Sequence, residues 1–151
     1  MSTFLAADIE RLSVLLGDEL DLYRQTREKT EEQAKLLDKD DIEAFNESLD
    51  KREKLIEQIK GLHRESAPLM QSYVSFTSGG KNKNKEIEKL NKQIREELEI
   101  SGRLNDENIE TMKNKTEDHI KRIDEQSAKR KGIGGYAQSV PNTPEVFDRK
   151  T

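Results

Sequence analysis

The two histidines are the side chains of this sequence that acid–base chemistry or metal binding would use first. Carboxylate metal sites in four-helix bundles use Glu-x-x-His pairs, but Lys60 and Thr116 stand three residues before His63 and His119. The sequence contains no cysteine. A catalytic triad needs a histidine beside Ser or Thr in a concave pocket, which narrow helical bundles rarely enclose. We therefore expect no metal site, no cofactor and no enzymatic activity.

Two further motifs have simple structural explanations. The stretch GIGGY at residues 132–136 lacks the Lys-Ser/Thr pair of a phosphate-binding loop and follows a predicted helix instead of a strand. The stretch KNKNK at residues 81–85 fits a solvated loop, with contact to an acidic partner as the alternative. Neither motif predicts a site of chemistry.

Apolar side chains near the C-terminus allow two interpretations. They are spaced as on one helix face, among many charges: Ile109, Met112, Ile120 and Ile123. In the first interpretation they complete the core of this chain. In the second they form an apolar face for a partner helix, to which a flexible methionine adapts well. Tyr136 and Phe147 lie further on and are either incidental or anchors for a partner, since aromatic residues often dominate binding.

The composition predicts elongated helices in place of a thick globular core. Of 151 residues, 31% are hydrophobic and 38% are charged, with a net charge of −4 and a mean hydropathy of −1.00. Apolar residues still recur at helical intervals, which separates this chain from disordered acidic sequences. The charges are interspersed, so we expect no nucleic-acid partner. Acidic residues near the start and the absence of an apolar span predict a soluble, cytoplasmic protein.

Three helices are expected, over about residues 4–37, 41–76 and 86–131. The first helix carries its apolar side chains at steps of three and four residues, or sums of these steps: Leu5, Ile9, Leu12, Leu16, Leu20, Tyr23, Ala34 and Leu37. Asp40 and Glu43 have the spacing of a capping box at the start of the second helix. The expected buried stripe of the second helix is Ile42, Phe45, Leu49, Arg52, Ile56, Ile59 and His63. Pro68 either kinks this helix or ends it, in which case Ser66 caps a short continuation.

The third helix is expected to be the longest, and therefore to overhang the other two or to bend. Residues 75–86, with paired glycines and no apolar periodicity, form the loop before it. Its expected stripe is Ile87, Leu90, Ile94, Leu98, Leu104 or Asn105, Ile109, Met112, Thr116, Ile120 and Ile123. The basic run ending at Lys131 and the following Gly132 predict its end. Residues 132–151, with two prolines, are expected to be disordered.

These elements predict an all-α fold: an elongated antiparallel three-helix bundle over residues 1–131, followed by a flexible tail over residues 132–151. Short connections make consecutive helices antiparallel neighbours. The capped hairpin LLDKDDIEAFNESLDKREKLIEQIKGL, the long third helix and the closing GGYAQSVPNTPEVFDRK together resemble the FlgN family of flagellar type III export chaperones. The resemblance covers most of the chain.

The resemblance implies a role and a set of residues. It implies cytoplasmic binding of the C-terminal helical region of hook-associated (hook-filament junction) proteins, before their delivery to the flagellar export gate in the membrane. The client-binding positions would be Ile109, Met112, Ile120 and Ile123 of the third helix. Tyr136, just beyond that helix, matches the position associated with docking to the export gate, and Phe147 would be a further tail anchor.

Two other functions remain open at this point. One is a related flagellar chaperone whose client is the filament-cap protein. The other is a coiled-coil adaptor or scaffold in which the third helix mediates homodimerisation. We expect a monomer or a weak homodimer.

Overall fold

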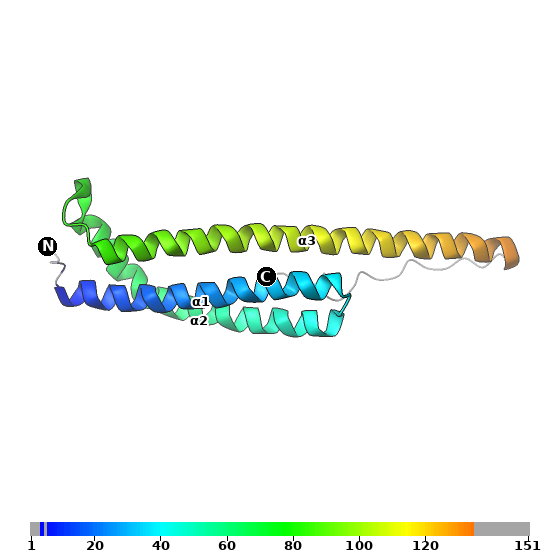
Figure 1. The fold of residues 1–151 in the computed structure, drawn as a ribbon, viewed down its shortest axis with the longest axis horizontal. Helices are drawn as coiled ribbons and strands as arrows, with labels where there is room; N and C mark the ends of the chain where they lie inside the picture. The colour runs from blue at the N-terminus through cyan, green and yellow to red at the C-terminus, as the bar shows by residue number, and fades with distance from the viewer. Residues whose placement is uncertain (1–3, 5, 135–151) are drawn as a thin grey trace.

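The chain folds into three long helices. The computed structural model describes residue 4 and residues 6–134, with side chains as far as residue 130. Helix α1 spans Ala6–Asp38, α2 spans Ile42–Phe76 and α3 spans Lys85–Gly134, with a short 3₁₀ turn, η1, at Ser78–Gly80. Figure 1 shows α1 and α2 as an antiparallel hairpin, with α3 running alongside α1 in the same direction. The predicted all-α fold with a long third helix is confirmed.

In the turn between α1 and α2, the N-cap residue of α2 lies one residue later than the sequence pattern predicted. Asp40 adopts a left-handed backbone conformation with φ 55°, which aspartate tolerates better than most residues because its short side chain bonds locally. The cap of α2 is therefore Asp41, whose Oδ1 accepts a 3.1 Å hydrogen bond from the backbone N–H of Ala44. The predicted capping box of Asp40 and Glu43 is wrong.

Helix α2 continues through Pro68 without ending. Pro68 and Arg64 are both exposed, so water can bond the Arg64 carbonyl that a proline ring leaves without its helical donor. The predicted alternative, a helix end with Ser66 as a cap, is wrong. Ser66 is buried, and its hydroxyl donates a 2.9 Å hydrogen bond to Oε1 of Glu19 on α1.

The second turn uses glycine where the backbone requires it. Gly79 and Gly80 have φ angles of 75° and 81°, a region that side chains disfavour. Asn84 then caps α3, because its Oδ1 accepts hydrogen bonds from the backbone N–H groups of Glu86 (3.0 Å) and Ile87 (3.1 Å). Helix α3 continues as far as Gly134, three residues past the predicted end at Lys131.

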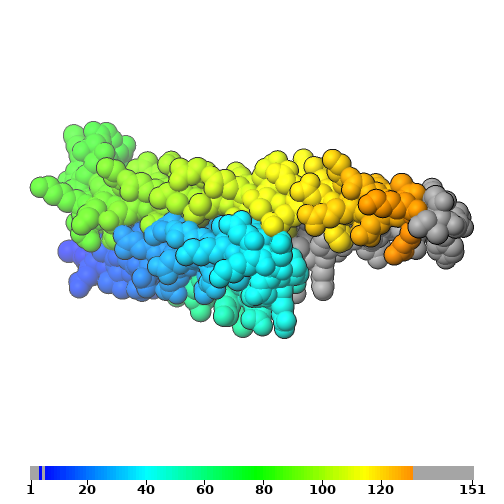
Figure 2. All heavy atoms as spheres, turned by 45° about the vertical axis from the view of Figure 1, so that its right-hand side comes forward, coloured from blue at the N-terminus to red at the C-terminus, as the bar shows by residue number. Residues whose placement is uncertain are grey.

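Helix α1 is the central helix, because it packs against both α2 and α3 along their lengths. Helices α2 and α3 meet chiefly through side chains near the loop that joins them. There Tyr73 donates a 2.9 Å hydrogen bond to Oε2 of Glu88 and accepts one of 2.9 Å from the Asn84 N–H. Figure 2 shows that α3 extends well beyond the other end of the hairpin, as its predicted length requires.

Apolar side chains gather at the two ends of the hairpin. The larger cluster surrounds Tyr73 and contains Phe4, Leu12, Leu16, Leu20, Ile87 and Leu90. The smaller cluster, at the α1–α2 turn, consists of Leu37, Phe45 and Leu49, with Met112 of α3 packed against it. Because hydrophobic burial is the main favourable term in folding, these clusters are the two points at which the helices are held most firmly.

Many of the buried side chains outside the two apolar clusters are polar, which the periodicity of apolar residues did not predict. Buried polar side chains come from all three helices: Glu19, Thr26, Thr30, Gln33, Ser48, Arg52, Ser66 and Asn108. Asn108 of α3 donates a 3.0 Å hydrogen bond to the backbone carbonyl of Thr30. This bond joins α3 to α1.

Several positions of the predicted stripes are more exposed than expected. The His63 side chain is 66% exposed and borders the outer surface of α2. Ile42 and Leu98 are 43% and 47% exposed. Ile42 and Leu98 were placed in the apolar stripes and His63 was predicted to be partly buried, and these predictions are wrong.

Candidate partner-binding surface

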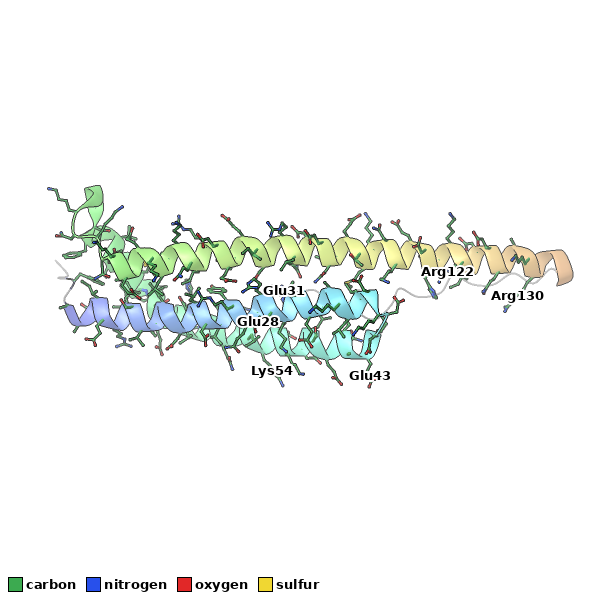
Figure 3. The ribbon with its side chains drawn as sticks, in the orientation of Figure 1. Glu28, Glu31, Glu43, Lys54, Arg122 and Arg130 are labelled. Atoms are coloured by element: carbon green, nitrogen blue, oxygen red, sulfur yellow. The ribbon has the colours of Figure 1, made fainter. Side chains whose placement is uncertain are left out.

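Helix α3 leaves the hairpin at a defined point. Nζ of Lys115 lies 2.7 Å from Oδ1 of Asp40, the residue at which the hairpin turns. Residues 116–134 continue for about 28 Å beyond this pair, at 1.5 Å per residue. We call residues 116–134 the extension. Figure 3 shows Arg122 and Arg130 on the extension, past the end of the hairpin marked by Glu43.

A hollow of about 440 Å³ lies where the extension meets the end of the hairpin. Leu37, Asp40 and Ile42 line it from the hairpin, and Met112, Thr116 and His119 from α3. Lys115, Asp118 and Arg122 complete its border. The hollow therefore has an apolar floor and charges of both signs at its rim, which suits an amphipathic segment better than a highly charged one.

The four α3 residues predicted to bind a partner occupy two different environments. Ile109 and Ile120 are 50% and 37% exposed. Met112 packs against the Leu37, Phe45 and Leu49 cluster, and Ile123 is half-buried. Met112 thus completes the core of the chain, as the first interpretation of the sequence predicted, while its neighbours on either side keep exposed apolar surface.

Tyr136 and Phe147, the predicted gate-docking residue and tail anchor, lie outside the described residues. Sequence reasoning missed the hairpin's share of the hollow, namely Asp40 and Ile42. The apolar Ile42 directly after the acidic turn was a usable signal, because the first residue of a helix at the end of a hairpin has little chance to be buried.

Ion pairs join the first third of α3 to α1. Nε of Arg27 lies 2.6 Å from Oε2 of Glu97, and its Nη1 contacts Glu31. Hydrogen bonds to Glu97 and Glu31 raise the pKa of Arg27. Arg24 approaches the same carboxylate of Glu97 at 3.8 Å. Glu97 is thus shared by two arginines of α1.

Arg52 is the exception among the charges of the interior. Its side chain is buried, and neither Nε nor Nη1 has a hydrogen-bond partner among the described residues. Burial lowers the pKa of its guanidinium. Gln33 Nε2 and Ser48 Oγ are also buried without a partner there. Several buried polar side chains of the bundle, here Arg52, Gln33 and Ser48, therefore have hydrogen-bonding groups without a partner among the described residues.

Two kinds of site are absent from the described part of the chain. Within residues 4 and 6–134, no group of three histidine or acidic side chains is placed to share a metal ion. No helix among the same residues is both long and apolar enough to cross a membrane.

The chain matches no family model, no curated protein and no solved structure.

Proposed function

We propose that this protein is a cytoplasmic export chaperone that binds the C-terminal helical region of a flagellar hook-filament junction protein and delivers it to the type III export gate. The proposal rests on the resemblance of the sequence to the FlgN family. One structural observation supports it: the extension has exposed or half-buried apolar side chains, and a hollow lies where the extension meets the end of the hairpin.

The chemistry of the surface suits a client helix. An amphipathic helix laid along the extension would cover Ile120 and Ile123 and place an apolar side chain in the hollow above Met112. The rim offers the carboxylate of Asp118 and the guanidinium of Arg122, so the client's flanking charges of either sign would find partners. The narrow apolar surface supports a moderate affinity, and release at the gate requires such an affinity.

Delivery to the gate is assigned to the tail. Tyr136 is the proposed contact with the export gate, and Phe147 a further anchor. Under this proposal Tyr136→Ala leaves client binding unchanged and lowers export of the client, measured as secreted client in the culture medium. Loss of both properties together would show that the tail and the client surface are not separate.

The test of the function uses the full-length protein and a purified hook-filament junction protein. We expect a stable complex by size-exclusion chromatography with light scattering, and no complex when the client lacks its C-terminal helical region. A filament-cap protein serves as the comparison client, because the related class of chaperone would prefer it. Binding to neither protein would contradict the chaperone proposal and favour an adaptor or scaffold.

A further inference from the structure

Three large apolar side chains form a row along one edge of α3. Leu98, Ile109 and Ile120 are 47%, 50% and 37% exposed, at intervals of eleven residues. Eleven residues make slightly more than three complete turns of an α-helix, so the three side chains lie nearly in line. We call them the edge row. At 1.5 Å per residue they stand about 16 Å apart, so a partner must match this spacing to cover all three.

The edge row is complementary to itself. Ile109 lies midway between Leu98 and Ile120, so a second α3 placed antiparallel about a two-fold axis at Ile109 meets the first in matching layers. Ile109 then faces its own copy, and each Leu98 faces the other copy's Ile120. Between these layers Gly102 faces Thr116, and the space beside Gly102 is open, which allows the two helices to approach closely.

The charges beside the edge row favour the same arrangement. Arg95, Asp106, Lys113 and Asp124 are exposed and lie on the same flank of the row by helical periodicity. None of them has an ion pair or hydrogen bond within residues 4 and 6–130. In the antiparallel pair Arg95 faces Asp124 and Asp106 faces Lys113, each twice. In a parallel pair in register the same flank of the two copies would lie on opposite sides of the contact, so these opposite charges would not meet.

We propose that a second copy of this chain docks on the edge row, forming an antiparallel α3–α3 dimer with its two-fold axis at Ile109. An isologous contact of this kind is the commonest in homodimers. The inference does not depend on the chaperone proposal. If both hold, dimer formation covers Ile109 and Ile120, and the second copy competes with the client for these side chains.

Disulfide cross-linking tests the geometry directly, because the natural sequence has no cysteine. Single cysteines are introduced into the full-length chain at Ile109, Leu98 or Ile120, with Val14→Cys, 59% exposed on α1, as the matched control. We expect Ile109→Cys to form disulfide dimers on mild oxidation much faster than Val14→Cys. Leu98→Cys should cross-link when mixed with Ile120→Cys and remain monomeric when oxidised alone. Fast cross-linking of Leu98→Cys with itself, or equal rates for Ile109→Cys and Val14→Cys, would overturn the proposal.

Charge exchange provides a second test that needs no new covalent bond. Asp106→Lys places lysines opposite each other at two points, and we expect the dimer dissociation constant to rise about tenfold in sedimentation at low salt. Lys113→Asp should have a similar effect, and the double exchange should restore the dimer. All of these sites are exposed, and far-UV circular dichroism confirms that each variant is helical. Equal dissociation constants for the four proteins, or no dimer in the unmodified chain, would refute the pairing. Both tests use the purified chain without client, so their failure leaves the chaperone proposal standing.

Discussion

Nζ of Lys115 on α3 lies 2.7 Å from Oδ1 of Asp40, the left-handed residue at which the α1–α2 hairpin turns. The pair marks the boundary between the part of α3 that runs beside the hairpin and the extension, which continues past the hairpin. Both side chains are partly or largely exposed, so the pair contributes little to stability. The Lys115–Asp40 pair matters because of where it lies: both residues line the hollow.

The buried hydrogen bond between Ser66 and Glu19 can be tested by substitution. Ser66→Ala removes the hydroxyl that donates to the buried Glu19 carboxylate. We expect the free energy of unfolding to fall by about 1.5–3 kcal/mol, because a hydrogen bond to a charged acceptor is lost. Urea denaturation measures the change. The control is Ser75→Ala, at an exposed position of the same helix, which should change stability by less than about 0.5 kcal/mol. Equal effects of the two substitutions would show that the buried bond is unimportant.

Arg52 should be a destabilising residue. Its guanidinium is buried with two nitrogen atoms unbonded within the described residues, and desolvation of such a group is costly. Arg52→Met keeps much of the volume and removes the charge, so we expect stability to increase by about 1–3 kcal/mol. Thermal unfolding followed by circular dichroism measures it. Lys54→Met, at an exposed site two residues away, should leave the melting temperature nearly unchanged. A lower melting temperature for Arg52→Met would mean that the guanidinium has a partner in solution.

The raised pKa of Tyr73 predicts that the folded protein loses stability at alkaline pH. Burial and the nearby Glu88 carboxylate raise the pKa of its hydroxyl above the ordinary value of 10.0, against the lowering effect of the Asn84 N–H. Because the folded state holds this proton more tightly than the unfolded state, the contribution is complete below pH 10 and is lost as pH rises through the folded pKa.

The measurement is urea denaturation of Tyr73→Phe and the unmodified chain at several pH values between neutrality and the alkaline range. We expect the variant to be less stable at neutral pH by about 1 kcal/mol, since it loses the bond to Glu88. Above pH 10 the difference should shrink. The pKa of Tyr23 is also raised, by burial and by Glu19. Tyr73→Phe should therefore still lose some stability as the pH rises. A difference that stays constant with pH would contradict the assignment.

The sequence predicts the helices well and their contacts less well. Apolar spacing identified Leu12, Leu16, Leu20, Phe45 and Leu49 as core residues, because burial of apolar area is the strongest signal that a sequence carries. It could not identify Glu19, Gln33 or Ser66, since polar residues are buried only where a partner helix supplies a bond or a cover. Asp40 and Asp41 offered two caps one residue apart, and the choice depended on backbone conformation at the turn.

The candidate surface was predictable only in part. The length of α3 relative to the hairpin predicted an overhang or a bend, and one of the two interpretations of its last apolar residues left them exposed for a partner. Exposure of Ile109 and burial of Met112, three residues apart on one helix, depend on where α1 and the hairpin turn lie around α3. Helical periodicity alone does not contain that information, because it gives the direction of each side chain but not the position of its neighbours.

The central claim is that apolar side chains on and beside the extension bind a client helix, and one titration tests it most directly. A labelled peptide of the C-terminal helical region of a hook-filament junction protein is titrated with the unmodified full-length chain, with Ile120→Asp, and with Val14→Asp. Val14 is an exposed apolar position on α1 (59%, against 37% for Ile120). The proposal predicts that Ile120→Asp raises the dissociation constant about tenfold or more, because an ionised side chain is placed in an apolar contact, while Val14→Asp leaves it unchanged. Equal dissociation constants for all three proteins, with helicity intact, would contradict the claim.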